Sequence, residues 1–216
     1  MLGRLLPLLA TLLIGAAQGL AMRASGSPAL PWAWAGAGYA LCVVAALAYL
    51  RGEDALKELL RFEGGDATRG LLAAAGALVI VYGASVAALA LLPTFAAREL
   101  LTVVRTAFGL AEKWQRLAAI VALAAAEEIV WRGAVLRALE ARLGSARAPW
   151  VAGALYVASV VPTLKLPMIG AAAVLAVATT LLVRRTGRVT PAIVAHAMFT
   201  WLALEMILPA LWNGVR

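Results

Sequence analysis

The sequence LAAIVALAAAEEIVWRGAVLRA, residues 117–138, is an apolar stretch that carries Glu127 and Glu128 at its middle and Arg132 four residues further on. A helix needs roughly 20 mostly apolar residues to cross the hydrocarbon core of a bilayer, which is about 30 Å thick. Comparable apolar runs cover residues 5–22, 29–50, 70–93, 149–163, 167–183 and 190–212. The pattern predicts an all-α fold, a polytopic membrane bundle of seven to eight transmembrane helices.

The composition supports a membrane protein over a soluble domain. Hydrophobic residues make up 64% of the 216-residue chain and charged residues only 14%. The net charge of +8 would suggest a nucleic-acid partner in a soluble protein. Here most basic residues flank predicted spans, where they set topology, and their distribution favours a cytoplasmic N-terminus. We therefore expect contact with the lipid bilayer and no nucleic-acid partner. The Ala, Gly and Arg content fits a GC-rich bacterial genome and hence the bacterial inner membrane.

The N-terminal half contains two segments with more than one interpretation. Residues 94–116 have apolar residues at helical spacing but many charges, which favours an interfacial amphipathic helix over an eighth span. Residues 5–22 could be a signal peptide, but Gly15 and Gly19 form a GxxxG pattern typical of packed spanning helices. We predict two regions: 1–116, with N-terminal spans, a cytoplasmic connector and the interfacial helix, and 117–212, a compact catalytic helical core.

Charged groups inside a span are candidates for function, because each costs on the order of 2.5–3.5 kcal/mol at the bilayer centre. Glu128 and Arg132 are four residues apart, so they meet on one helix face as an ion pair. Glu127 is rotated by about 100° and has no local partner, which leaves it available as a general base. The alternative interpretation is an ordinary helical ion-pair pattern without a catalytic role.

His196 is the only histidine of the chain, and Thr200 lies one turn further along the same predicted helix. A single histidine on an apolar helix can also be an ordinary hydrogen-bonded core residue. A catalytic zinc site usually has three protein ligands, often two or three of them histidines. Because the chain has one histidine and one cysteine, Cys42, we expect no zinc and no required cofactor. We interpret Cys42 as a small core residue.

The motifs EEIVWRG, residues 127–133, and RRTGRVTPAIVAHA, residues 184–197, resemble the CPBP family of membrane proteases. This family includes the type II CAAX prenyl endopeptidases and the bacterial Abi proteins, and the resemblance covers residues 117–208. It implies a glutamic intramembrane protease in which Glu127 activates water and Glu128 with Arg132 supports it. His196 and Thr200 would support the oxyanion.

Two positions depart from the family pattern. The second motif is an aromatic residue followed four residues later by histidine. Tyr156 occupies the aromatic position, but Val160 stands where the histidine is expected. Thr200 replaces the asparagine of the third motif. Thr200 keeps one hydroxyl donor, whereas Val160 has none. The neighbouring Ser159 or Tyr156 are the side chains that could compensate.

The prediction is an endopeptidase, a hydrolase that cleaves near the C-terminus of a membrane-anchored protein or peptide. An alternative is a catalytically silent relative that binds a partner at the membrane, in immunity or secretion. Val160 favours that alternative, and the retained Glu127 and His196 oppose it. A transporter with Glu127 as a proton relay has less support, because no duplicated halves are visible. The sequence does not define the substrate or the oligomeric state.

Overall fold

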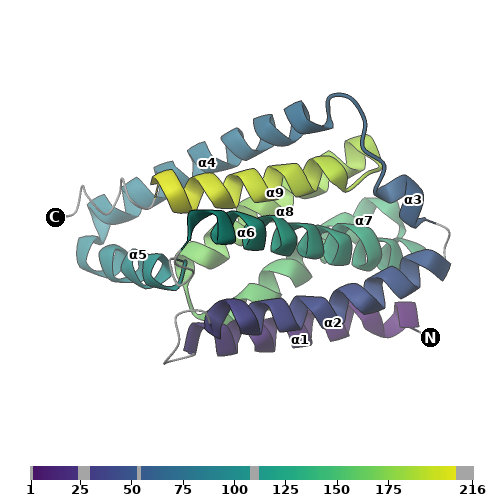
Figure 1. The fold of residues 1–216 in the computed structure, drawn as a ribbon, viewed down its shortest axis with the longest axis horizontal. Coiled ribbons are helices and arrows are strands. Elements are labelled where there is room, and N and C mark those ends of the chain that lie inside the picture. Colours follow the sequence, from purple (N-terminus) through teal and green to yellow (C-terminus); the bar gives the residue numbers. More distant parts are fainter. Residues whose placement is uncertain (1, 24–29, 53–54, 108–111, 208–216) are drawn as a thin grey trace.

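The protein is all-helical in the computed structural model, which describes residues 2–23, 30–52, 55–107 and 112–207 (Figure 1). The helices are α1 (Leu2–Arg23), α2 (Leu30–Gly52), α3 (Leu56–Leu59), α4 (Asp66–Leu91), α5 (Pro93–Ala107), α6 (Lys113–Glu128), α7 (Leu136–Val160), α8 (Leu166–Thr186) and α9 (Thr190–Leu202). Two π-helical segments, η1 (Ile129–Val135) and η3 (Ala203–Ile207), and a 3-10 turn, η2 (Val161–Thr163), complete the chain. No strand occurs in the described ranges, so the predicted all-α class is confirmed.

Four of the described helices are long and apolar enough to cross a membrane: Leu5–Arg23, Leu30–Arg51, Asp66–Leu91 and Leu166–Thr186. They correspond to the predicted spans 5–22, 29–50, 70–93 and 167–183. The predicted total of seven to eight spans is not confirmed. The remaining three predicted spans lie on helices that are charged, broken or short, and residues 208–212 of the last one lie outside the described residues.

The helix that carries the acidic pair differs from the four long apolar helices. Helix α6 continues through η1 into the first turns of α7 and includes the ionisable side chains of Glu127, Glu128 and Arg132. The chain then breaks at Gly144, where φ is +72°, a conformation that favours glycine. Residues 145–160 form a separate helical run inside α7. The predicted spans 117–138 and 149–163 therefore lie on the two sides of this break.

The N-terminal helices pack directly onto the C-terminal half (Figure 1). Helix α1 lies beside α2 and contacts α7, while α6 packs between α2 and α9. Small residues allow these close approaches. A Cβ atom placed at Gly19 would lie 3.2 Å from the Pro162 carbonyl oxygen, and one at Gly15 would lie 3.4 Å from the Ser159 carbonyl oxygen. The predicted GxxxG pattern therefore lies on a real helix-packing face.

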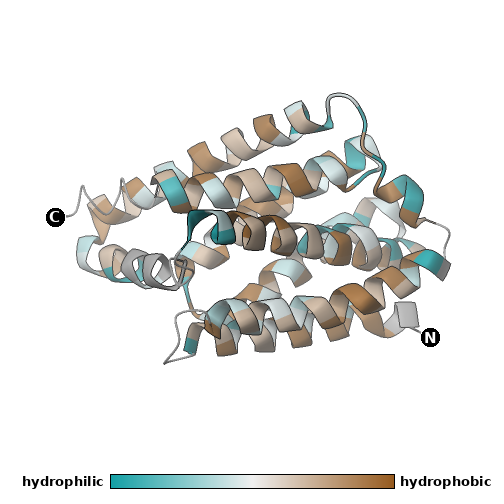
Figure 2. Cartoon of the chain, in the orientation of Figure 1, coloured by the Kyte–Doolittle hydropathy of each residue, from teal (hydrophilic) through white to brown (hydrophobic). Residues whose placement is uncertain are grey.

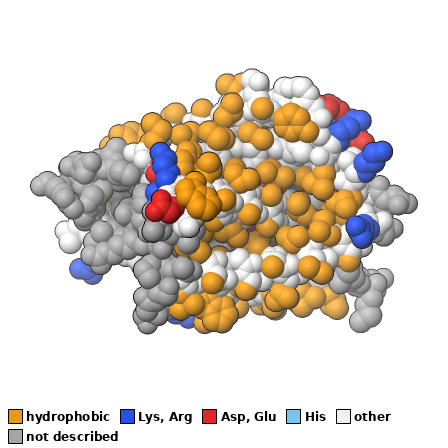
Figure 3. Space-filling model, in the orientation of Figure 1, with side chains coloured by type: hydrophobic (Ala, Val, Ile, Leu, Met, Phe, Trp, Pro, Cys, Tyr) orange, Lys and Arg blue, Asp and Glu red, His pale blue; other side chains and the backbone are white. Residues whose placement is uncertain are grey.

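The outer surface is apolar along the middle of the helices and charged near their ends (Figures 2 and 3). Large apolar side chains point outward, for example Leu12, Val44 and Val79, which are 60%, 70% and 73% exposed. Such a surface would be poorly soluble in water and matches a lipid-facing one. Cys42 is a buried free cysteine, as expected for a small core residue.

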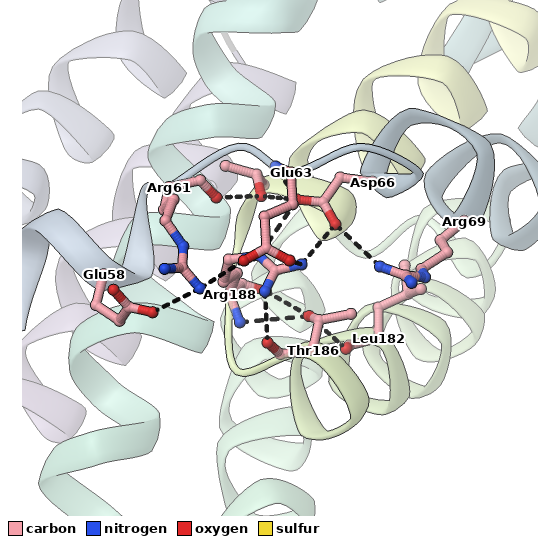
Figure 4. A network of polar contacts seen from close by, with 9 residues as sticks. Glu58, Arg61, Glu63, Asp66, Arg69, Leu182, Thr186 and Arg188 are labelled. Carbon is pink, nitrogen blue, oxygen red and sulfur yellow. Dashed lines mark hydrogen bonds and ion pairs between the residues drawn. The ribbon is translucent and has the colours of Figure 1, made fainter.

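One end of the bundle is held by a polar network between the α3–α4 connection and the α8–α9 connection (Figure 4). The guanidinium group of Arg188 lies 2.9 Å from Asp66 Oδ1 and 2.9 Å from Glu63 Oε2. The Thr190 hydroxyl donates to Asp66 Oδ2 at 2.8 Å, and Arg69 lies 3.3 Å from Asp66 Oδ1. Hydrogen bonding to Asp66 raises the pKa of Arg188 above its usual value. This network, which we call the Asp66 clamp, ties the start of α9 to the α3–α4 connection.

The predicted interfacial helix over residues 94–116 is divided in the structure. Helix α5 ends at Ala107 and packs against α4 and α8, whereas residues 113–116 form the first turn of α6. Arg116 is buried in the bundle, with Nε 2.9 Å from Glu205 Oε1. Residues 108–111 lie outside the described part of the chain. The ion pair explains why this turn belongs to the bundle instead of continuing α5.

Candidate active site

The acidic pair lies where α6 changes from α-helix to π-helix. Glu127 and Glu128 are the last residues of α6, and η1 begins at Ile129. Six consecutive residues of η1, Val130 to Val135, are all buried, so this turn is enclosed on every side. Gly133 allows the enclosure, because a Cβ atom there would lie 2.9 Å from Leu59 Cδ2. Single π-helical turns inside α-helices occur frequently at functional sites.

Glu128 bridges two charged side chains from different helices. Its Oε2 atom lies 3.4 Å from Arg132 Nε, which confirms the contact predicted from the four-residue spacing. Its Oε1 atom lies 2.8 Å from His196 Nδ1 on α9. Because an ionised carboxylate only accepts hydrogen bonds, His196 Nδ1 is the donor. Glu128 therefore orients the histidine as well as neutralising the arginine.

The other nitrogen of the imidazole ring points toward Glu127. His196 Nε2 lies 3.6 Å from Glu127 Oε2, so the ring stands between the two carboxylates. Glu128 is fully buried, whereas Glu127 borders a cavity. The structure thus separates the two carboxylates as the sequence predicted: one belongs to an internal ion pair and one reaches open space.

Aromatic rings surround the arginine. The Arg132 guanidinium carbon lies 4.6 Å from the centroid of the Tyr156 ring, a cation–π contact. Trp131 meets the same ring edge-on, with centroids 5.8 Å apart and an interplanar angle of 65°. The Thr179 hydroxyl, on α8, is a further neighbour of Glu128. These contacts hold Arg132 away from the cavity, where it supports Glu128 instead of meeting a ligand.

A cavity of about 310 Å³ lies among α1, α2, α4, α6, α7, α8 and α9. Its lining is mostly apolar, and its polar members are Gln18, Tyr39, Ser85, Glu127, Tyr156, Thr163, His196 and Thr200. Binding sites for small ligands and peptides typically combine such an apolar wall with a few convergent polar groups. Of the five predicted site residues, Glu127, His196 and Thr200 line the cavity, and Glu128 and Arg132 lie behind it.

Val160 faces this cavity and is 4% exposed. The position where the family pattern has histidine is thus directed into the site, but it offers only methyl groups. Ser159 does not compensate, because its hydroxyl is buried and donates to the Tyr156 carbonyl oxygen at 2.7 Å. Tyr156 does reach the site, because it lines the cavity together with Glu127 and is an electrostatic neighbour of that carboxylate.

Sequence reasoning missed Gln18 and Tyr39, which come from α1 and α2. Gln18 Nε2 donates to the Tyr39 hydroxyl oxygen at 2.9 Å. The Tyr39 phenol lines the same cavity as Glu127 and is an electrostatic neighbour of its carboxylate. Both residues lie within apolar predicted spans, and a polar side chain in such a span was the signal that could have identified them.

Two buried polar atoms of the cavity residues have no hydrogen-bond partner in the part of the chain that the structure describes. They are Gln18 Oε1, an acceptor, and Trp32 Nε1, a donor. Within the same part, no group of three or more His, Cys, Asp or Glu side chains is arranged to hold a metal ion. The expectation that the site works without a metal ion stays a prediction.

Comparison with known proteins identifies the region that contains this site. The family model for type II CAAX prenyl endopeptidase Rce1-like matches residues 109–202. A search of curated proteins and a search of solved structures each give no match. The matched region runs from α6 to the end of α9 and includes all five predicted site residues and Val160. Residues 109–202 of the chain are therefore similar to the Rce1-like type II CAAX prenyl endopeptidases.

Proposed function

We propose that the protein is a membrane endopeptidase that uses Glu127 as a general base to cleave a membrane-anchored protein or peptide near its C-terminus. The observation that carries this proposal is the different position of the two carboxylates. Glu128 is buried between Arg132 and His196, whereas Glu127 reaches the cavity beside His196 Nε2. A carboxylate in this position can take a proton from water next to a bound carbonyl group.

The proposed reaction follows from these positions. Glu127 accepts a proton from water while the water oxygen attacks the peptide carbonyl carbon. Thr200 and His196, both on the cavity wall, donate hydrogen bonds to the oxyanion that forms. As an imidazolium, His196 donates from Nδ1 to Glu128 and from Nε2 toward the oxyanion. When the C–N bond breaks, Glu127 returns its proton to the leaving amine.

The polar atoms on the cavity wall favour a peptide as the ligand. Gln18 Oε1 can accept a hydrogen bond and Trp32 Nε1 can donate one, and neither has a partner among the described residues. An extended peptide supplies both an N–H donor and a C=O acceptor, so it can satisfy both atoms. The apolar remainder of the wall suits apolar side chains or a lipid anchor of the substrate. We propose no cofactor for the reaction.

The second candidate function is a silent relative that binds a membrane partner without cleaving it. Val160 is the observation in its favour, because the cavity position that carries histidine in the family pattern has no hydrogen-bonding group. Loss of a group that acts on the transition state typically costs roughly 10²- to 10³-fold in rate. The two functions share the cavity and differ only in whether a bond is broken.

The test compares C-termini and processed forms of membrane proteins in cells that express the wild-type protein, Glu127→Gln or Glu58→Gln. Glu58 is the matched control, because it is an exposed glutamate in the connector, 61% exposed, and lies outside the cavity. We expect cleavage products that disappear with Glu127→Gln and persist with Glu58→Gln. Identical products in all three strains would overturn the proteolytic function and leave the silent relative.

We also propose a bacterial inner membrane as the location, with a cytoplasmic N-terminus. The support is the basic residues near one set of span ends, together with the apolar helices. A reporter fused to the N-terminus, active only in the cytoplasm, tests the orientation. An inactive reporter on a stably inserted protein would reverse the topology.

A further inference from the structure

We propose that Tyr39, held by Gln18, is a further catalytic residue: its phenol group binds the Glu127 carboxylate and supplies the hydrogen-bond donor that Val160 lacks. This inference rests on the proposed proteolytic function. It extends the site beyond the matched region, because Gln18 belongs to α1 and Tyr39 to α2, whereas the family match begins at residue 109.

The hydrogen bonds around the phenol group have a defined direction. Tyr39 is 2% exposed and lines the cavity. Gln18 Nε2 donates to its oxygen at 2.9 Å, so the hydroxyl hydrogen is left for another acceptor. Tyr39 and Glu127 line the same cavity, and we assign this neighbouring carboxylate as the acceptor. The chain Gln18 to Tyr39 to Glu127 therefore ends on the proposed base.

The position of this pair is set by the crossing of α1 and α2. Ala17 and Gly38 immediately precede Gln18 and Tyr39 along the chain. A Cβ atom placed at Gly38 would lie only 2.5 Å from Ala17 Cβ, so the two helices touch at this point. Contact between the preceding residues brings the amide and phenol groups together. The pairing thus follows from rigid helix packing and not from a flexible loop.

Tyr156 is also a neighbour of Glu127 on the cavity wall, but its ring has other partners. It lies beneath the Arg132 guanidinium group and against the edge of Trp131, and it occupies the aromatic position of the family pattern. Its placement is therefore accounted for without the N-terminal helices. Tyr39 is the additional donor, supplied by a helix outside the matched region.

The role of Tyr39 requires no net proton transfer from the phenol group. In the resting site its hydroxyl hydrogen binds the Glu127 carboxylate and orients it toward the cavity. When Glu127 takes the proton from water, its negative charge disappears and the carbonyl oxygen of the peptide becomes negative. The phenol hydrogen bond then shifts to that oxyanion. Collapse of the intermediate re-forms the C=O bond and expels the amine, which receives the water-derived proton from Glu127.

The test measures cleavage of the Glu127-dependent products by Tyr39→Phe, Gln18→Leu and the control Tyr82→Phe, which removes a half-exposed phenol on α4. We expect roughly a 10²-fold loss with Tyr39→Phe, a smaller loss with Gln18→Leu and none with Tyr82→Phe. Adding Val160→His to Tyr39→Phe should restore part of the rate, because a donor returns to the family position. A rate unchanged by Tyr39→Phe would overturn the inference while leaving the proposed function intact.

An infrared measurement on the purified protein tests the contact between Tyr39 and Glu127 without a substrate, and so independently of the proposed proteolytic function. The difference spectrum of wild type minus Glu127→Gln isolates the stretching bands of the Glu127 carboxylate. We expect Tyr39→Phe to shift these bands and Tyr82→Phe to leave them in place. Unshifted bands would contradict the contact even in a variant that folds poorly. Absence of any Glu127-dependent cleavage would reject the proposed function and the catalytic role of Tyr39 together.

Discussion

The molecule contains two buried charge clusters with different degrees of satisfaction. In the Asp66 clamp, both carboxylate oxygens of Asp66 are bonded, by Arg188, Arg69, Thr190 and the Glu63 backbone N–H. Around Glu128, Oε2 and both Nη atoms of Arg132 are buried without a hydrogen-bond partner among the described residues. A fully bonded cluster stabilises the fold, whereas an incompletely bonded cluster beside a cavity still has polar atoms that can take part in function.

The largest effect should come from breaking the central cluster at Glu128. We expect Glu128→Gln to destabilise the protein by about 3 kcal/mol, because it leaves the Arg132 charge buried without its counter-charge. It should also abolish cleavage, since His196 loses the negatively charged carboxylate that orients it and stabilises its protonated form. Thermal denaturation in detergent measures the first effect and product analysis the second. Glu127→Gln, which keeps the ion pair, is the control that should lose only cleavage.

The next effect concerns the Asp66 clamp. Asp66→Asn should lower the melting temperature by several degrees, because the fully buried side chain loses its charge while Arg188 keeps its own. The rate per folded molecule should stay close to that of wild type, as the clamp lies at the bundle end, away from the cavity. A specific loss of cleavage in correctly folded Asp66→Asn would show that the two clusters are coupled, and the comparison above would fail.

A smaller effect should follow from the oxyanion side of the cavity. Thr200→Val removes one hydroxyl donor at nearly constant volume, so we expect about a tenfold loss of cleavage and little change in stability. Thr200→Ser keeps the hydroxyl and should retain most of the activity. Equal activity in Thr200→Val and wild type would exclude Thr200 from oxyanion support.

The smallest effect should come from Thr190, a neutral member of the clamp. Thr190→Val removes a 2.8 Å hydrogen bond to Asp66, which is worth about 1 kcal/mol. In a protein of this size the melting temperature should fall by roughly 2–4 °C. Cleavage should be unchanged. If Thr190→Val lowered the melting temperature as much as Asp66→Asn, the Thr190 hydroxyl would stabilise the protein by more than one neutral hydrogen bond can.

The accuracy of the sequence predictions depended on how local the responsible interaction is. The ion-pair contact between Glu128 and Arg132 was predictable because both residues lie on one helix, four positions apart. The contact between Glu128 and His196 joins residues 68 positions apart, and it requires α9 to pack beside α6. The resemblance pointed to His196, but the sequence did not say which carboxylate holds it.

The span count was not confirmed, for a related reason. Hydropathy identifies a segment that can enter a membrane, but α6 and α7 are stabilised by internal pairs and aromatic contacts that hydropathy ignores. The break at Gly144 and the π-helical turn at Ile129–Val135 also depend on neighbouring helices. Gly133, for example, is in close contact with Leu59 and Leu50 of other segments.

By itself, the sequence determined the helical class, the apolar surface, the identity of the acidic pair and the loss of a donor at Val160. These properties depend on composition, on 3.6-residue periodicity and on residue type, all of which are local. Only the tertiary structure decided that Glu128 and not Glu127 accepts the hydrogen bond from His196 Nδ1, and that α1 and α2 bring Gln18 and Tyr39 to the cavity. Those facts arise from the packing of distant helices against one another, and packing depends on shapes that no single segment contains.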